Sequence, residues 1–288
     1  MGFFASVNGV VTDAAEARVS VLDNGFTFGD AVYETLRTYN RRPFHLDRHL
    51  ARLRRSAARL RIALPVDDAE MARRVDALLD RSQHPESYLR IIVSRGVGDI
   101  SYNFDRVAGP TVVMVTKPFQ PFPESHYSEG IAVILSSVQR NHPRALDPAI
   151  KSCNLINSVL AVQEAQEKGA LEPIMLNADG DVAEGASSNV FLVKGGVLVT
   201  PTLEAGILPG VTRELVLERA RALGVPVREA TVRPSELLEA DEAFITSSLK
   251  ELAPIRAIDG KPLGNGRPGP VTLRLLADFR AYAPLHSV

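Results

Sequence analysis

Two short stretches carry most of the chemical information in this chain: Lys151-Ser152-Cys153-Asn154-Leu155 and Glu184-Gly185-Ala186-Ser187-Ser188-Asn189. A lysine amine attacks aldehydes only when it is largely neutral, which requires burial or a nearby positive charge. Lys151 lies between Pro148 and the apolar positions of a predicted helix over 154–168, which indicates that the adjoining backbone is buried. An exposed lysine in a loop before a helix is the alternative.

Glu184 follows a turn at 177–181 and precedes the apolar strand 190–193. A carboxylate held against a pyridine nitrogen keeps that ring protonated, and the charged ring accepts electrons when a proton leaves the α-carbon of an amino acid. The small residues after Glu184 allow the backbone to approach a ligand closely. Lys151 and Glu184 together therefore predict pyridoxal 5′-phosphate chemistry. A solvated glutamate is the alternative.

A third stretch, Leu208-Pro209-Gly210-Val211-Thr212-Arg213, opens a predicted helix over 212–223. The amides of Val211 and Thr212 are expected as donors at a helix N-terminus, which favours a phosphate. Arg52, on an amphipathic helix over 46–60, would add a permanent positive charge. The alternatives are an ordinary N-cap by Thr212 and an arginine on a solvated helix face.

Composition narrows the class of partner. The 288 residues are 45% hydrophobic, enough for a sizeable core and more consistent with two domains than one. Lys plus Arg (33) nearly cancels Asp plus Glu (34), which argues against nucleic acid or a membrane surface and favours small molecules. The single cysteine, Cys153, and the lack of a secretory signal or membrane-spanning stretch lead us to expect a cytoplasmic protein.

The order of predicted elements indicates an α+β protein with a small N-terminal domain (1–117), a Pro-rich linker (118–126) and a larger C-terminal domain (127–288). The predicted elements of the first domain are strands near Phe3, Val10 and Val19–Val21, helices over 46–60 and 68–80, and strands over 88–94 and 111–115. Those of the second are strands over 131–137, 174–176, 190–199 and 243–246, and helices over 154–168, 212–223 and 271–282.

Together these segments resemble the class IV aminotransferases, the fold-type IV pyridoxal phosphate enzymes. This family includes branched-chain aminotransferases, D-amino acid aminotransferases and aminodeoxychorismate lyases. The resemblance extends from the start signature over 24–34 to the Gly269-Pro270 pair before the last helix. It implies a small α/β lobe, a larger β-barrel-like lobe with helices, a cofactor between them, and a homodimer whose partner contributes loops to each pocket.

The resemblance also implies roles for individual residues. Lys151 would be the catalytic residue, bonding to the cofactor and moving a proton at the substrate's α-carbon, while Glu184 would pair with the pyridine nitrogen. The other implied cofactor-binding residues are the phosphate ligands Arg52, Val211, Thr212 and Ser248, the ring contact Leu208, and the pocket residues Ser187 and Asn189.

Tyr88 and Arg90 lie two residues apart on a predicted strand, so their side chains point to one face and could orient a carboxylate. This pattern resembles branched-chain aminotransferases. An arginine paired with a structural carboxylate is the alternative. The remaining expected substrate-binding residues are Tyr33, Tyr102, Ser248 and Leu249.

The leading hypothesis is a ping-pong transaminase that uses a branched-chain or related hydrophobic amino acid and 2-oxoglutarate, with Arg90 on the distal carboxylate. The segments Phe26–Asp30 and Lys151–Leu155 are more similar to the D-amino acid and lyase branches. Lys250 is unusual for a branched-chain enzyme and could bring a positive charge near the substrate entrance.

Three alternatives to this hypothesis stay open: a D-amino acid or (R)-amine transaminase, an aminodeoxychorismate lyase, and a non-catalytic protein with the same fold. No metal site is expected. His45 and His49 are four residues apart but have no obvious third ligand, so helix-face residues are the simpler interpretation.

Overall fold

The computed structural model describes residues 2–287, which form two compact units. The first unit holds the chain up to Gln120, the short segment Ile150–Asn154 and the chain from Ala283 onward, and the second unit holds the rest. Lys151 therefore belongs to the first unit, although the residues on both sides of its segment belong to the second. The linker predicted over 118–126 and the domain boundaries beside it stay a prediction.

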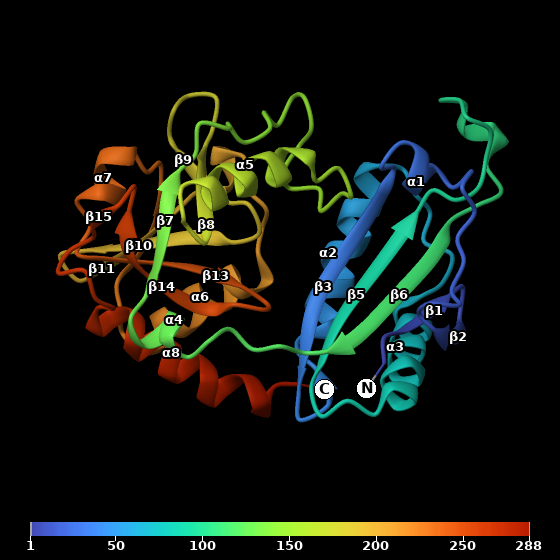
Figure 1. Cartoon of the computed structure of the whole chain (residues 1–288), viewed down its shortest axis with the longest axis horizontal. Helices are drawn as coiled ribbons and strands as arrows, with labels where there is room; N and C mark the ends of the chain where they lie inside the picture. Colours follow the sequence, from blue (N-terminus) through green and yellow to red (C-terminus); the bar gives the residue numbers. More distant parts are fainter. Residues whose placement is uncertain (1, 288) are drawn as a thin grey trace. The chain divides into compact units, whose positions relative to one another are not determined.

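The first unit is built on an antiparallel sheet that has six strands within residues 2–287, in the order β2-β1-β6-β5-β3-β4 (Figure 1). The strands are β1 (Phe4–Val7), β2 (Val10–Asp13), β3 (Ala31–Tyr39), β4 (Arg42–Pro43), β5 (Ser87–Ser94) and β6 (Thr111–Pro118). The helices are α1 (Asn24–Thr27), α2 (Leu46–Arg59), α3 (Asp68–Ser82) and the 3-10 turns Phe104–Arg106 and Ala283–Leu285.

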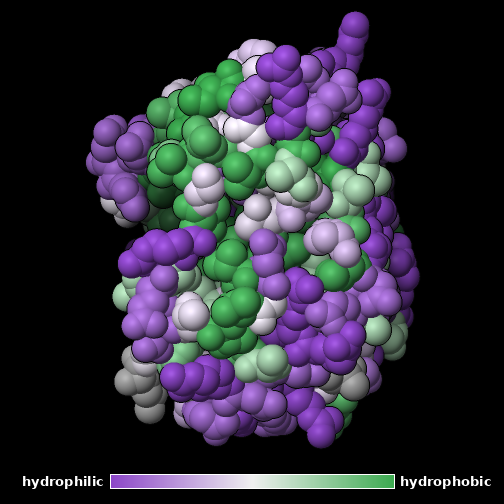
Figure 2. Space-filling view, turned by 90° about the vertical axis from the view of Figure 1, so that its right-hand side faces the viewer, coloured by the Kyte–Doolittle hydropathy of each residue, from purple (hydrophilic) through white to green (hydrophobic). Residues whose placement is uncertain are grey.

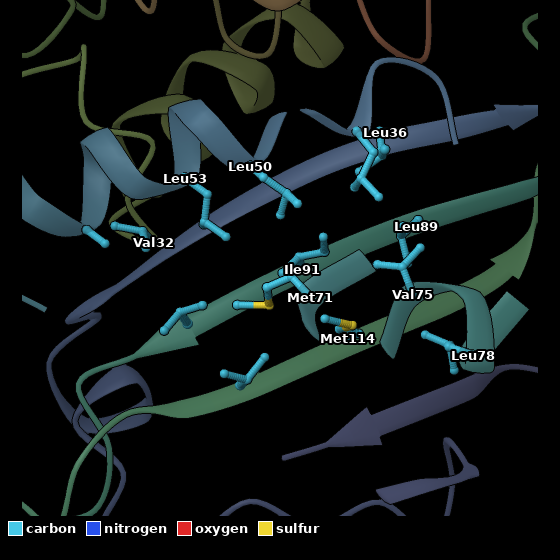
Figure 3. Packing of buried hydrophobic residues seen from close by; sticks show 14 of the residues in the cluster. Val32, Leu36, Leu50, Leu53, Met71, Val75, Leu78, Leu89, Ile91 and Met114 are labelled. Carbon is cyan, nitrogen blue, oxygen red and sulfur yellow. The ribbon is translucent and has the colours of Figure 1, made fainter. Parts of the chain in front are cut away.

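Helices α2 and α3 cover one face of this sheet. Apolar residues recur at helical spacing along both helices, and alternate residues of the strands meet them in one buried cluster. Figure 3 shows Leu50 and Leu53 of α2 in this core with Leu89 and Ile91 of β5. Each fully buried side chain of this size contributes about 1.5–3 kcal/mol to folding. The predicted helices over 46–60 and 68–80 are confirmed.

The prediction of a strand at Val19–Val21 is wrong. This segment has no regular structure, and Val19 and Val21 are exposed. The longest strand of the sheet is instead β3, which the sequence analysis did not identify. Glu34 lies among the inward-facing apolar positions of β3 and interrupts the alternation that marks a half-buried strand.

The second unit contains a mixed sheet, nine-stranded within the part of the chain that the structure describes (Figure 1). Its strands run in the order β12-β11-β10-β13-β14-β7-β8-β9, and β15 pairs with β14. They are β7 (Ile131–Leu135), β8 (Glu172–Leu176), β9 (Val182–Gly185), β10 (Asn189–Lys194), β11 (Val197–Pro201), β12 (Val227–Ala230), β13 (Glu242–Ser247), β14 (Glu251–Ile258) and β15 (Lys261–Pro262). The helices are α4 (Ser125–Ser128), α5 (Ile156–Glu167), α6 (Val211–Ala222), α7 (Pro234–Leu238), α8 (Pro270–Tyr282) and the 3-10 turn Leu203–Ala205.

Central strands β10 and β13 are apolar on both faces, and the rings of Phe191 and Phe244 stack with centroids 5.0 Å apart. Two turns of this sheet, β9 to β10 and β13 to β14, carry residues that the sequence assigns to the cofactor. The predicted α+β fold class is confirmed. None of the helices within residues 2–287 is long and apolar enough to cross a membrane.

Candidate active site

The backbone around Lys151 is fixed to two elements of the first unit. The Lys151 carbonyl accepts a hydrogen bond from the Tyr33 amide at 2.9 Å, and the Cys153 amide donates to the Ala31 carbonyl at 2.8 Å. On the other side, the Lys151 amide donates to Ser56 Oγ of α2 at 3.1 Å. The lysine is therefore attached to the start of β3 and to α2, and its backbone is not that of a free surface loop.

The side chains of Lys151, Tyr33 and Arg90 come together in the first unit. Lys151 Nζ lies 4.5 Å from the centre of the Tyr33 ring, and the Arg90 guanidinium carbon lies 4.1 Å from it. The positive charge of Arg90 also acts on the thiol of Cys153. Burial raises the pKa of Tyr33 and of Cys153, although Arg90 opposes both shifts, so the hydroxyl and the thiol stay protonated at neutral pH.

Arg90 keeps one donor available in this cluster. Its Nε is buried and has no hydrogen-bond partner among residues 2–287. A buried guanidinium N–H without an acceptor is costly, so an anionic ligand is the natural partner.

Two expected substrate residues lie outside the Lys151 cluster. Tyr88 is on the same face of β5 as Arg90, but its ring lies 5.1 Å from Lys117 Nζ. Tyr102 is 85% exposed in the single chain and packs on the Phe28 ring, with centroids 5.2 Å apart.

Arg52 makes a bidentate contact with a residue that the sequence analysis missed. Its Nε and Nη2 donate to the two carboxylate oxygens of Glu34 at 2.8 and 2.7 Å, and His49 Nδ1 lies 2.6 Å from Glu34 Oε2. Burial alone would raise the pKa of Glu34, but Arg52 and His49 outweigh it and lower the pKa to about 2. Burial lowers the pKa of His49, so a neutral imidazole donates its Nδ1–H.

The position of Glu34 offered one signal in the sequence. It lies midway between Val32 and Leu36, both fully buried, so the strand alternation places its carboxylate on the buried face. A buried carboxylate requires a cationic partner, and Arg52 supplies it. His49, interpreted from the sequence as a helix-face residue, is fully buried beside them.

Glu184 is buried at the end of β9, where three donors converge on its carboxylate. Arg140 Nε donates to Oε1 at 2.8 Å, while the Leu208 amide and Asn189 Nδ2 donate to Oε2 at 3.0 and 3.2 Å. Arg140 was not predicted, because it lies in an irregular loop 44 positions earlier and nothing local marks it as a partner.

Asn189 connects Glu184 to the segment before α6. Its Nδ2 also donates to the Leu208 carbonyl at 3.0 Å. Gly210 makes this arrangement possible, because a Cβ there would lie only 2.0 Å from Asn189 Oδ1. The three residues predicted to surround the cofactor ring, Glu184, Asn189 and Leu208, therefore form one hydrogen-bonded group.

Helix α6 begins at Val211, and its N-cap is Gly210, which has no side chain that could bond the first amides. The alternative that Thr212 is an ordinary N-cap is therefore wrong. Val211 and Thr212 are buried, and Thr212 Oγ1 has no hydrogen-bond partner within the described residues. Amide donors without a capping side chain and an unpaired hydroxyl, at the positive end of a helix, suit a phosphate.

The other predicted residues lie on two turns of the second unit. Ser187 follows β9 and hydrogen-bonds Glu172, while Ser248 and Leu249 lie half-buried between β13 and β14.

Comparison with known proteins identifies the family. The model for amino-transferase class IV matches residues 31–258. A putative branched-chain-amino-acid aminotransferase from Methanocaldococcus jannaschii is 37% identical over 274 residues, covering 95% of this chain and 94% of the relative. A D-alanine aminotransferase from Bacillus licheniformis is 39% identical over 265 residues, covering 92% of each.

Solved structures agree with this result. The T.th. branched-chain amino acid aminotransferase, complexed with N-(5′-phosphopyridoxyl)-L-glutamate, matches with a TM-score of 0.93 at 29% identity, covering 99% of this chain and 95% of that chain. This chain belongs to the class IV aminotransferases. It is a pyridoxal phosphate-dependent aminotransferase, as its resemblance to the family predicted.

The residues present fit this cofactor on structural grounds. The Thr212 hydroxyl, unpaired within residues 2–287, and the start of α6, whose N-cap is a glycine, suit its phosphate, and the buried Glu184 carboxylate suits a protonated pyridine nitrogen.

Proposed function

We propose that this enzyme moves an amino group between a branched-chain or related hydrophobic amino acid and 2-oxoglutarate by a ping-pong mechanism. The observation that carries the proposal is Arg90, whose guanidinium lies on the Tyr33 ring beside Lys151 and whose buried Nε has no partner within residues 2–287. A guanidinium held in this way binds a carboxylate well. The glutamate adduct bound to the T.th. aminotransferase supports glutamate and 2-oxoglutarate as the second substrate pair.

Bound pyridoxal phosphate supplies an aldehyde that bonds to amines and a ring that accepts electrons. We assign Lys151 as the residue that bonds to the cofactor and then carries the proton at the substrate's α-carbon. Glu184, oriented by Arg140, holds a proton on the pyridine nitrogen. The residues assigned to the phosphate are Arg52, Val211, Thr212 and Ser248, those assigned to the ring and pocket are Leu208, Ser187 and Asn189, and those assigned to the substrate are Tyr33, Arg90, Tyr88, Tyr102, Ser248 and Leu249.

Replacement of Arg90 tests the substrate assignment. In Arg90→Ala, the KM for 2-oxoglutarate should rise by roughly tenfold or more, while the KM for a monocarboxylic oxo acid should change little. Arg54→Ala is the matched control, because Arg54 pairs with Asp68 on an exposed face of α2. An Arg90→Ala enzyme with unchanged affinity for 2-oxoglutarate would rule out this role.

A D-amino acid donor is the second candidate, favoured by the 39% identity to the D-alanine aminotransferase of Bacillus licheniformis. Titration of the purified enzyme with L-leucine and, separately, with D-alanine distinguishes the two, because transfer of the donor amino group removes the absorbance band of the aldehyde form of the cofactor. A response to D-alanine alone would replace the branched-chain assignment. Release of aminobenzoate without an oxo-acid acceptor would indicate the lyase reaction instead.

We also propose a homodimer, on the basis of apolar surface. Figure 2 shows apolar side chains gathered on one face of the molecule. In the first unit, Leu22 and Phe26 are exposed beside Ile100 and Tyr102, on two segments joined by the hydrogen bond from the Gly98 amide to the Leu22 carbonyl. In the second unit, α5 exposes Ile156, Val159 and Leu160. Exposed apolar side chains gathered in this way are typical of protein interfaces. We propose a cytoplasmic location as well, as expected from the single cysteine, Cys153.

A further inference from the structure

Lys250 and Glu172 form a partly buried ion pair in the second unit. Lys250 Nζ lies 2.6 Å from Glu172 Oε2, with 15% of the lysine side chain and 3% of the glutamate side chain exposed. The sequence suggested that Lys250 brings a positive charge to the substrate entrance, but this buried carboxylate compensates that charge. Removal of one partner from such a pair is costly, because the other charge is left buried and uncompensated.

The pair joins elements that are distant in sequence. Glu172 begins β8, whereas Lys250 closes the turn between β13 and β14 that carries Ser248 and Leu249. The Lys250 amide donates to Ser247 Oγ at 3.2 Å, so the lysine backbone belongs to this turn. The ion pair therefore ties the turn with the proposed phosphate ligand Ser248 to the start of β8.

Glu172 also holds the turn between β9 and β10. Its Oε1 accepts from the Ser187 amide at 3.0 Å and from the Ser188 hydroxyl at 2.7 Å, and Lys250 Nζ donates to Ser187 Oγ at 2.8 Å. Gly185 lets this turn lie against the carboxylate, because a Cβ there would lie 2.7 Å from Glu172 Oε1. This ion pair thus contacts two turns that both carry proposed cofactor ligands.

We propose that Lys250 is a positioning residue of the cofactor site, which together with Glu172 fixes the Ser187 turn relative to the Ser248 turn. The inference rests on the proposed function in one respect, because Ser187 and Ser248 are assigned to the cofactor there. Glu184 and Asn189 flank the Ser187 turn, so its displacement would also move the carboxylate meant for the pyridine nitrogen. Groups that contact a ligand keep their geometry only when the residues behind them are fixed.

Charge compensation and positioning can be separated with two single variants and their combination: Lys250→Met, Glu172→Gln and Glu172→Gln/Lys250→Met. The two measurements are the thermal midpoint of the apo protein and the dissociation constant for pyridoxal phosphate, titrated without substrate. Lys168→Met is the matched control, because Lys168 forms a 2.7 Å ion pair with Glu164 on an exposed part of the same unit.

Lys250→Met should lower the thermal midpoint and weaken cofactor binding. The double variant should recover most of the midpoint, because no buried charge is left unpaired, yet bind the cofactor about tenfold more weakly than the wild type, because the connection between the turns is lost. Lys168→Met should match the wild type in both measurements.

Two results would overturn the proposal: wild-type cofactor affinity in Lys250→Met, or recovery of cofactor affinity together with stability in the double variant, which would make the pair purely structural. If Lys250→Met does not fold, the cofactor affinity of the double variant tests the proposal: wild-type affinity would overturn it. Because no substrate is present, an error in the assigned amino donor would leave this result unchanged.

Discussion

Arg52 and Glu34 form a two-pronged contact in which Arg52 Nε and Nη2 each donate to a different oxygen of the same buried carboxylate, at 2.8 and 2.7 Å. Two parallel hydrogen bonds fix the plane of the guanidinium as well as its position. The direction of its remaining N–H donors is therefore set before any ligand binds. Glu34 therefore orients the Arg52 guanidinium for the contacts that Arg52 makes with a ligand.

Replacement of Glu34 by glutamine should flatten the dependence of stability on acid pH. The pKa of Glu34 is lowered from 4.5 to about 2 in the folded protein, so its contribution is fully present above pH 4.5 and is lost as the pH falls toward 2. This lowering of the pKa corresponds to on the order of 3 kcal/mol in the free energy of unfolding. Urea unfolding between pH 7 and pH 3 measures it, with the exposed Glu239→Gln as control. Parallel curves for Glu34→Gln and the wild type would contradict this account.

Arg52→Lys should weaken the binding of pyridoxal phosphate by about tenfold, because an ammonium keeps the charge but cannot form the two-pronged contact with Glu34. Pyridoxal lacks the phosphate, so its affinity should be the same in the variant and the wild type. Equilibrium titration of the apo protein with both compounds measures the two dissociation constants in the variant and in the wild type. Equal losses for the two compounds would mean that Arg52 does not act on the phosphate.

Glu184→Gln should lower kcat by roughly a hundredfold or more, the usual consequence of removing a preorganised charge from a reacting centre. Arg140→Met leaves the carboxylate in place without its charged donor and should cost about tenfold, as loss of an orienting partner does. Steady-state kinetics of both variants check the order of the effects. A larger loss in Arg140→Met than in Glu184→Gln would show that the arginine acts independently of Glu184.

Charge placed on the exposed face of α5 should dissociate the proposed dimer. In Ile156→Glu/Leu160→Glu, each carboxylate would have to be buried without a partner at a dimer interface, which association does not tolerate. Sedimentation velocity should show the mass of one chain for this variant and of two for the wild type. Leu238→Glu, on the exposed side of α7, is the control. A wild-type protein that sediments as a single chain would end the dimer proposal.

The sequence was most informative where one residue type carries the chemistry within a short stretch. Lys151 and Glu184 were singled out because a lysine before an apolar helical pattern and a carboxylate before small residues are unusual neighbours. Their partners were harder to find, because Ser56, Arg140 and Leu208 approach from distant segments and no local pattern encodes such contacts.

Strand β3 shows the same limit in the fold. Glu34 is a charged residue at a position that the alternation assigns to the core, so the sequence did not show the pattern of a half-buried strand. The residue that breaks the pattern is also the one that binds Arg52. The ion pair of Lys250 could not be predicted for a related reason. Its ammonium is neutralised by Glu172, 78 residues away, and the sequence offers no sign of that pairing.

The segment Ile150–Asn154 has a consequence for the order of events during synthesis. The first unit's own strands have all left the ribosome once residue 118 has emerged, yet the piece that carries Lys151 follows only after the second unit has begun. Domains generally fold as they are synthesised, N-terminal part first. The segment with Lys151 is thus synthesised after every strand of the first unit's sheet, and a nascent chain that stops before residue 151 lacks the amine that we assign to the cofactor.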